Sequence, residues 1–369
     1  MTQCVGDFDI AVIGAGMAGA SLAAECAPHA RVLLVEAEDA PGYHTTGRSA
    51  AFWEETYGGP GVLPLTMASG RFLREGGFLS PRGALNLGMA KDRLKVEAFV
   101  ETFAALGATI RLQDRAALES RVPGLRSEWV VGAWEPECAD IDVAGLHQHY
   151  LAASKHGGTV LRVRARVDQV EREGANWRIA WAGGEARVPV LVNAAGAWAD
   201  TLAQVAGALP LGIQPLRRTI VQLRTEPAPA DTLPLTLGIN EDFYFKPQAG
   251  RLWLSPHDEI PDVAGDAAPE ELDVAIAIDR FEKVVDWKIA ALERRWAGLR
   301  SFAPDRLPVY GFDPQVAGLF WFAGQGGFGI QTAPAAARLA AQILLGLPRD
   351  GLTAEIDPAA YSPARFTAT

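Results

Sequence analysis

The chain has 369 residues, of which 49% are hydrophobic, so it can bury more than one small core, and two closely packed domains are expected. Its 44 acidic and 34 basic residues give a formal net charge of −10, which argues against nucleic acid as a partner. Cys4, Cys26 and Cys138 are scattered, which favours buried thiols over a disulfide framework or a zinc cluster. No apolar stretch is long enough to span a bilayer and no signal peptide is recognisable. A cytoplasmic protein is therefore expected, with peripheral contact with the inner membrane left open.

The N-terminal segment has the pattern of a βαβ unit. Residues 8–13 (FDIAVI) are apolar and predict a strand, 14–19 (GAGMAG) open a helix that runs through Cys26, and 31–36 (RVLLVE) predict a second strand. A span of about 30 residues is the length that a parallel crossover needs. Residues 37–59 then form a long loop with at most a short helix, and long loops are often functional.

The middle of the chain combines helices with strands. Helices are expected at 91–107 and 143–156, and strands at 159–163, 176–182, 188–196, 216–224 and 243–247. The last two strands alternate polar and apolar residues, as antiparallel strands with one polar face do. A further helix is expected from near Glu270 toward Leu292, because a proline and two acidic residues mark its start.

The C-terminal segment repeats the strand, glycine turn and helix order. A strand at 319–323 leads into the turn 324–329 (GQGGFG), and a helix follows from about Thr332 to Gly346. Since the chain begins and ends in α/β units, a nucleotide-binding domain built from discontinuous segments is expected, with a second domain inserted. The predicted division assigns 1–80, 141–212 and 297–369 to the first domain, and 81–140 and 213–296 to the second.

The first glycine turn has the signature of a dinucleotide-binding site. Gly14, Gly16 and Gly19 form G-x-G-x-x-G between a strand and a helix, where glycines permit a tight turn, close approach to a pyrophosphate and helix packing. Glu36 ends the next strand, where a carboxylate can accept hydrogen bonds from ribose hydroxyls. The second glycine turn has no further strand with a terminal acid, so it is interpreted as approaching another part of the same cofactor.

Five motifs in order resemble one known family along nearly the whole chain. They are GAGMAG with Glu36, TTGRSAA (45–51), VNAAGAWAD (192–200), WAGLRSFAPDRLPVYG (296–311) and FAGQGGFGIQTAP (322–334). This order resembles the FAD-dependent D-amino acid oxidase superfamily, and within it the bacterial D-arginine dehydrogenase type, which shares a GYH-x-TGRSAA loop, a P-x-RR strand and an FY-x-KP strand. The resemblance implies a Rossmann-like FAD-binding domain of the GR2 type with an inserted antiparallel-sheet α+β substrate domain. It also implies FAD held noncovalently.

The resemblance places Ser49 and Ala50 beside the flavin ring and the turn from Gly326 to Gln331 at its pyrimidine end. Amides at a helix N-terminus would stabilise the negative charge of reduced flavin there. The full set of implied FAD contacts is Gly14, Gly16, Met17, Ala18, Gly19, Glu36, Ala37, His44, Thr45, Thr46, Arg48, Ser49, Ala50, Ala51, Val167, Ala195, Gly196, Trp198, Gly298, Arg300, Gly326, Gly327, Phe328, Gly329, Ile330 and Gln331.

The resemblance assigns substrate binding to four residues. Arg217 and Arg300 are expected to bind the substrate carboxylate, with Tyr244 as a phenol donor and Tyr57 as a lid or wall residue. Arg218 is expected to face the opposite way to Arg217 on its strand, so that one of the pair lies in solvent or in a salt bridge. For Arg300 a structural ion pair is the alternative.

The histidines identify no catalytic base and no metal. For His44, in the loop near the cofactor, a hydrogen-bonded structural role and a role in proton transfer both stay open. His147 and His149 are two apart on a helix and cannot share a metal, so no metal site is expected.

Three departures from the arginine-selective relatives bear on specificity. Ala84 replaces an acid, Phe52 replaces a histidine and Glu54 replaces a threonine, which favours an apolar pocket and neutral or aromatic D-amino acids. Glu54 and Glu241 could still attract a basic side chain. Gln331 completes the predicted substrate pocket.

The resulting hypothesis is an FAD-dependent D-amino acid dehydrogenase that forms 2-oxo acids and ammonia by hydride transfer from Cα to flavin N5. Its electron acceptor is expected to be a quinone, a dye or dioxygen. The alternatives are oxidation of an N-methyl amino acid or a 2-hydroxy acid, or a flavoprotein subunit that needs a partner chain. An NAD-dependent dehydrogenase is disfavoured because a second complete βαβ unit is lacking.

Overall fold

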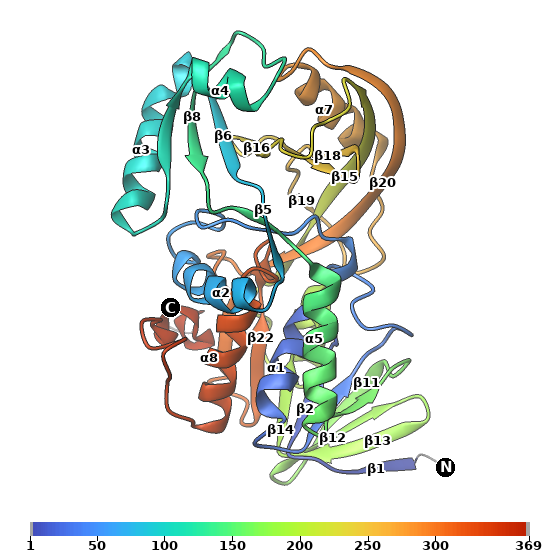
Figure 1. Cartoon of the computed structure of the whole chain (residues 1–369). Coiled ribbons are helices and arrows are strands. Elements are labelled where there is room, and N and C mark those ends of the chain that lie inside the picture. The colour runs from blue at the N-terminus through green and yellow to red at the C-terminus, as the bar shows by residue number, and fades with distance from the viewer. Residues whose placement is uncertain (1–2, 367–369) are drawn as a thin grey trace.

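The computed structural model describes residues 3–366, in two parts that lie one above the other in Figure 1. The lower part is built on a largely parallel sheet and contains both ends of the described chain. The upper part is built on a larger, mostly antiparallel sheet. Cys26 and Cys138 are buried free thiols, whereas the side chain of Cys4 lies outside the described residues.

A six-stranded sheet forms the centre of the lower part. Its order is β10 (Val160–Arg162), β3 (Val32–Val35), β2 (Ile10–Ile13), β14 (Val190–Asn193), β22 (Leu319–Ala323) and β21 (Val309–Phe312), and only β21 is antiparallel to its neighbour. The strands β2 and β3 are buried on both faces, as expected for a covered parallel sheet.

Each face of this sheet packs against a different layer. Ile10 and Val12 of β2 join an apolar cluster with the helices α1 (Met17–Cys26) and α8 (Ala333–Leu345). The alternate residues Ala11 and Ile13 join a cluster that includes Trp177 of a small mixed sheet. The elements completing these layers are α5 (Val143–His156), α6 (Ala199–Val205), β1 (Gln3–Asp7), β11 (Val167–Glu173), β12 (Asn176–Trp181) and β13 (Gly184–Val188).

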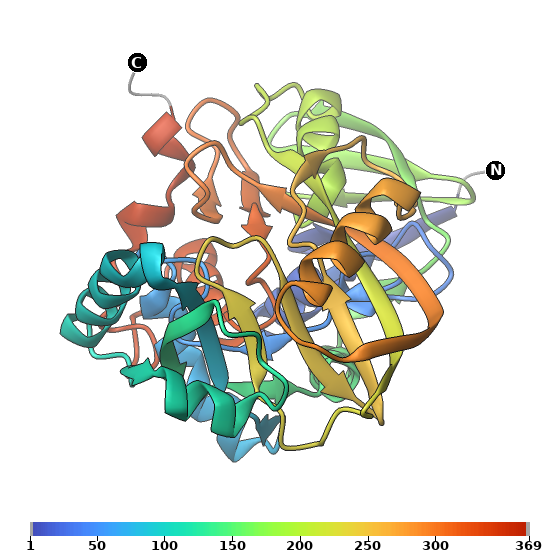
Figure 2. The same ribbon diagram turned by 90° about the horizontal axis from the view of Figure 1, so that it is seen from above.

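A ten-stranded sheet dominates the upper part. Its order is β23 (Gln325–Gly326), β20 (Lys288–Phe302), β15 (Gln214–Glu226), β18 (Arg251–Ser255), β17 (Tyr244–Gln248), β16 (Leu235–Gly238), β6 (Ala84–Met89), β8 (Trp129–Glu135) and β7 (Arg111–Asp114), with β19 (Ile260–Pro261) paired to β15. The view from above in Figure 2 shows α7 (Glu271–Glu282) lying across β15 and β20. Val221 and Phe245 pack on this outer face, so Ile220 and Tyr244 project from the other face.

Shorter elements join the two parts. A three-stranded sheet contains β4 (Phe52–Trp53), β9 (Ala139–Ile141) and β5 (Leu79–Pro81). The remaining helices are α2 (Leu63–Glu75), α3 (Arg93–Ala105) and α4 (Arg115–Arg121), with short 3-10 turns η1 (Thr46–Arg48), η2 (Ala90–Asp92), η3 (Gly196–Trp198), η4 (Pro358–Tyr361) and η5 (Pro363–Phe366).

The structure corrects one predicted element. The helix expected from Glu270 toward Leu292 ends as α7 at Glu282, and β20 begins at Lys288. The long pairing of β20 with β15 explains the change, because tertiary pairing overrides local helical preference. We keep the division into two discontinuous domains as a proposal, with β20 passing from one part to the other.

Candidate active site

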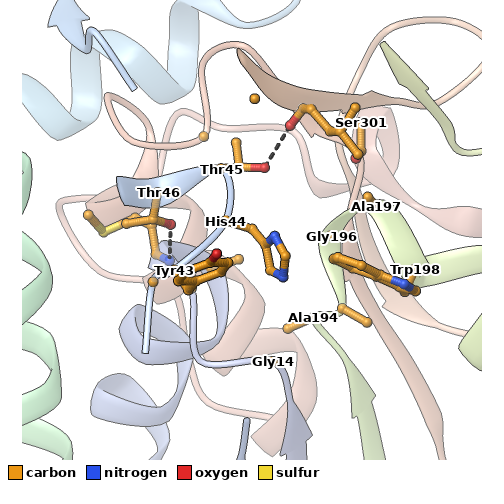
Figure 3. Close-up of a pocket in the computed structure, with 18 of the residues that line it drawn as sticks. Gly14, Tyr43, His44, Thr45, Thr46, Ala194, Gly196, Ala197, Trp198 and Ser301 are labelled. Carbon is orange, nitrogen blue, oxygen red and sulfur yellow. Dashed lines mark hydrogen bonds between the residues drawn. The ribbon is translucent and has the colours of Figure 1, made fainter. Parts of the chain in front are cut away.

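A cavity of about 1780 Å³, part of it open to solvent, lies between the two parts of the molecule. Figure 3 shows its lining side chains from the loop after β3 and from η3 facing one another above Gly14. Of the predicted FAD contacts, the lining contains Gly14, Gly16, Met17, Ala18, Glu36, Ala37, His44, Thr45, Thr46, Arg48, Ser49, Ala50, Val167, Ala195, Gly196, Trp198, Gly298, Arg300, Gly326, Gly327, Gly329 and Ile330. Gly19, Ala51, Phe328 and Gln331 are not in the lining.

The phosphate-binding turn depends on glycines, because a side chain at these positions would collide with the backbone. A Cβ on Gly19 would lie 1.8 Å from the carbonyl oxygen of Gly14, so any larger residue would force α1 away from β2. Gly14 itself has a φ of 103° and faces Ala194. No acidic residue occupies the first turn of α1, and its N-cap residue Gly16 has no side chain to cap it. Apart from the amide of Met17, which donates to the Thr46 hydroxyl, the first turn therefore leaves amides and the positive dipole end for an anion.

The carboxylate of Glu36 is fixed at the end of β3. One oxygen accepts a hydrogen bond from the amide of Ala15 at 2.8 Å, and the other accepts from the amide of Glu38 at 3.0 Å. Glu36 is buried and lines the cavity beside the first glycine turn. This position fits contact with the ribose of a dinucleotide.

The loop after β3 forms one wall of the cavity. The imidazole of His44 lies between the rings of Tyr43 and Trp198, with centroid distances of 4.9 and 4.8 Å (Figure 3). Nε2 of His44 lies 3.0 Å from the carboxylate of Glu38, and its buried Nδ1 has no partner. Thr46 accepts a hydrogen bond from the amide of Met17 at 2.9 Å, which ties the loop to α1.

The predicted histidine roles outside the cavity are structural. His147 is buried on α5, and its Nε2 lies 2.9 Å from the carbonyl oxygen of Ala15. His149 packs among aromatic rings of α2 and its neighbours. Among residues 3–366 no group of three His, Cys, Asp or Glu side chains could hold a metal.

Two arginines and two tyrosines meet at the inner end of the cavity. Arg218, Arg300 and Tyr244 line it. Tyr57 lies just behind, where its hydroxyl accepts a hydrogen bond from Nη1 of Arg300 at 2.7 Å. A Cβ on Gly327 would lie 2.2 Å from the Tyr57 hydroxyl, so this glycine makes room for the pair.

The structure corrects the expected roles of Arg217 and Arg218. Arg217 projects from the opposite face of β15, where its guanidinium pairs with Asp273 at 3.1 Å, Glu270 at 2.8 Å and Asp262 at 3.3 Å. Asp273 and Glu270 belong to α7 and its N-cap, which cover that face. The alternation of β15 therefore turns Arg218 into the cavity.

Arg218 is held in place but retains hydrogen-bonding capacity. Its Nε donates to the carbonyl oxygen of Asp258 at 2.7 Å and its Nη2 donates to Glu259 at 3.3 Å, whereas Nη1 is buried without a partner. Burial lowers the pKa of Arg218, and the neighbouring charge of Arg300 lowers it further. An anion in the cavity would relieve this repulsion.

The five predicted substrate-pocket residues do not line the cavity. Phe52, Glu54 and Ala84 are buried beyond Tyr244, and Glu241 lies in a turn before β17. Gln331 is a positioning residue, because its buried side-chain amide donates to the carbonyl oxygens of Glu54 and Tyr57 and to the Thr66 hydroxyl.

Sequence reasoning missed several lining residues. They are Ile13, Val35, Glu38, Gly42, Tyr43, Ala165, Arg166, Ala194, Ala197, Thr201, Leu202, Val205, Arg218, Ile220, Leu299, Ser301 and Gln325. The signal that could have found Ile220 is the two-residue period of β15, since it shares a face with Arg218.

Comparison with known proteins identifies the family. Residues 9–343 match the family model described as DAO, FAD dependent oxidoreductase. The chain belongs to this family. Its cofactor is therefore FAD, as predicted, and the mixed α/β fold of the family is confirmed.

Two relatives share modest sequence identity with this chain. The bifunctional protein ThiO/ThiG of Synechocystis is 24% identical over 98% of this chain and 54% of its own length, so the chain spans about half of that relative. The glycine oxidase of Geobacillus kaustophilus is 23% identical over 91% of this chain and 93% of its own length.

Two solved structures show the same fold. The crystal structure of glycine oxidase from Geobacillus kaustophilus has a TM-score of 0.84 at 21% identity and covers 97% of this chain and 99% of its own. That of L-proline dehydrogenase from P. horikoshii has a TM-score of 0.85 at 22% identity, with 98% of each chain covered. Within residues 3–366, no helix combines the length and apolar character that crossing a membrane requires.

The cavity fits FAD. The first turn of α1, which carries no acidic residue, suits the pyrophosphate, and Glu36 suits the ribose. The unpartnered Nδ1 of His44 offers a hydrogen-bonding group to the cofactor. A Cβ on Gly16 would lie 3.2 Å from the Thr46 hydroxyl, so the glycine also keeps this approach open.

Proposed function

We propose that this chain oxidises D-amino acids with neutral or apolar side chains to imino acids, which water converts to 2-oxo acids and ammonia. One observation carries the proposal. Arg300 is partly buried and forms no ion pair with a carboxylate among residues 3–366. It lies beside Arg218, whose Nη1 is buried and lacks a hydrogen-bond partner. Two neighbouring guanidinium groups that line one cavity can form a site for a carboxylate.

Tyr244 completes the proposed carboxylate site. Its hydroxyl is buried without a hydrogen-bond partner and its ring lines the cavity. A substrate carboxylate would accept hydrogen bonds from Arg218, Arg300 and Tyr244, which would fix the orientation of Cα. When bound, FAD would accept the hydride from Cα, and the amine would lose a proton to water.

Gly326 and Gly327 bring a second part of the cavity close to this site. Gly326 pairs with Ser301 of β20, the residue after Arg300, so the second glycine turn and the carboxylate site are joined by one strand pair. Tyr57 screens Arg300 from the far side, and burial raises the pKa of its phenol, which keeps it protonated. Exclusion of water by these groups would strengthen the hold on the carboxylate.

The choice of the D-enantiomer rests on the shared loop and strand motifs and is the finer part of the proposal. The electron acceptor, a quinone, a dye or dioxygen, and a cytoplasmic location belong to the same proposal. The names of relatives include glycine oxidase and L-proline dehydrogenase, so the substrate panel should include glycine and L-proline.

The test mixes the purified yellow protein without oxygen against D- and L-amino acids, glycine, N-methyl amino acids and 2-hydroxy acids. Bleaching of the flavin absorbance by neutral D-amino acids, with formation of the matching 2-oxo acid, is the expected result. Bleaching by L-amino acids, N-methyl amino acids or 2-hydroxy acids in preference to D-amino acids would overturn the proposal.

A further inference from the structure

The sheet face that carries Tyr244 continues to a second group of polar residues. Tyr244 of β17 pairs with Leu237 of β16, and Leu237 pairs with Asn86 of β6. Two residues along β6, Ala84 pairs with Glu135 of β8. Directly paired residues project from the same face of a sheet. At roughly 4.8 Å between strands, the backbone of Asn86 lies roughly 10 Å from that of Tyr244.

Glu54, Asn86 and Glu135 form what we call the carboxyl cluster. The side-chain amide of Asn86 donates to Glu54 at 3.4 Å and to Glu135 at 3.3 Å, and the Thr56 hydroxyl donates to Glu135 at 2.7 Å. Oε2 of Glu54 is buried without a partner. The cluster therefore has an acceptor that could bind a hydrogen-bond donor or a cation.

The ring of Phe52 stands between the cavity and the carboxyl cluster. It packs against Tyr244 at a centroid distance of 6.0 Å and against Tyr57 at 5.3 Å. The same apolar cluster contains Ile220, which lines the cavity, and Ala84, which neighbours Glu135. Phe52 is buried, and neither it nor any member of the carboxyl cluster lines the cavity.

We propose that Phe52 determines the side-chain specificity of this chain. Its ring ends the space beyond Tyr244, so the substrate side chain must be short and neutral, and it separates the substrate from the carboxyl cluster. Without the ring, a longer side chain could extend along the sheet face, and one that ends in an ammonium group could reach Glu54. This inference rests on the proposed oxidation of amino acids.

The test compares kcat/KM for D-alanine, D-norvaline, D-norleucine and D-lysine, since D-lysine is D-norleucine with a terminal ammonium. In the unmodified holoenzyme, kcat/KM should fall at least about 10-fold from D-alanine to D-norleucine, because a side chain that does not fit loses transition-state binding. In the Phe52→Ala variant, the ratio of kcat/KM for D-norleucine to kcat/KM for D-alanine should rise at least about 10-fold. The same variant should raise kcat/KM for D-lysine more than it raises kcat/KM for D-norleucine.

A second variant tests whether Glu54 causes the larger increase in kcat/KM for D-lysine. Adding Glu54→Gln to Phe52→Ala should remove the preference for D-lysine over D-norleucine and leave the gain of D-norleucine intact. Phe52→Leu, a milder truncation, should shift the ratio in the same direction if Phe52→Ala folds poorly. Phe312→Ala, on the half-exposed edge strand β21, is the matched control and should leave the ratios unchanged.

Three results would overturn the inference. The first is an unchanged ratio in both Phe52 variants, and the second is unmodified protein that already prefers D-lysine to D-norleucine. The third is a D-lysine gain that survives Glu54→Gln, which would remove the carboxyl cluster from the inference. Failure of the proposed function is distinguishable, because the unmodified protein would then oxidise none of the four amino acids while still containing FAD.

Discussion

The cofactor end and the substrate end of the cavity are built in different ways. At the cofactor end, consecutive residues of one turn supply amides, and glycines such as Gly14 and Gly19 supply space. At the substrate end, Arg218, Tyr244 and Arg300 come from three strands far apart in the chain. Residue spacing in the sequence predicts a site that one local turn forms. A site formed by side chains of several strands also depends on which face of each strand lines the cavity.

Gly19→Ala should have the largest effect, on the cofactor end alone. The added Cβ would meet the carbonyl oxygen of Gly14 at 1.8 Å, so α1 must move and its amides leave the phosphate site. We expect the purified variant to lack the flavin absorbance. Gly351→Ala, with no atom within 4 Å of the new Cβ, is the matched control and should keep the cofactor. A yellow Gly19→Ala protein would contradict this account.

Arg218→Ala and Arg300→Ala should affect the substrate end alone. Each substitution removes one charged donor from the substrate carboxylate in the site. The loss of transition-state stabilisation should be about 2–5 kcal/mol, so kcat/KM should fall about 30- to 5000-fold. FAD should remain bound, which the flavin absorbance reports. The comparison between the two ends would fail if either variant kept ordinary kcat/KM or lost its cofactor.

Arg217→Ala should change stability rather than catalysis. The substitution leaves buried Asp273 without its cation and should lower the free energy of unfolding by about 3 kcal/mol. Urea unfolding of the holoenzyme, followed by tryptophan fluorescence, measures the loss. A kcat/KM reduced as strongly as in Arg218→Ala, at unchanged stability, would show that Arg217 and not Arg218 faces the substrate.

The pH dependence of stability should report the region behind Phe52. Burial raises the pKa of Glu54 to about 7 from its ordinary 4.5, so the folded protein keeps a proton that the unfolded chain has lost. The contribution of Glu54 to the free energy of unfolding is fully present below pH 4.5 and is lost as pH rises through about 7. The total loss is no more than about 3 kcal/mol. Glu54→Gln should flatten this part of the curve in urea unfolding at several pH values. An unchanged slope would show that Glu54 is ionised in the folded protein.

Sequence patterns predicted the first βαβ unit, the glycine turns and most of the lining near FAD, because these features depend on neighbouring residues. They did not predict the face of β15, because Arg217 and Arg218 are chemically identical and only the packing of α7 distinguishes them. They also missed Glu135, which lies far from Glu54 and Ala84 in the chain. Strand pairing brings it beside Ala84, and the side-chain amide of Asn86 links it to Glu54. The loss of an acid at position 84 therefore predicted an apolar pocket where the structure has buried carboxyl groups nearby.

The adjacent arginines of β15 constrain how this chain can change in length. One inserted or deleted residue between Gln214 and Arg218 would exchange their faces, so that a single event would remove both an anchor of α7 and a substrate contact. The bulges at Gln222/Leu223 and Arg224/Thr225 lie beyond the arginines and show that this half of the strand already accommodates irregular pairing. Length variation in β15 during evolution should therefore be confined to the half of the strand that follows Gln222.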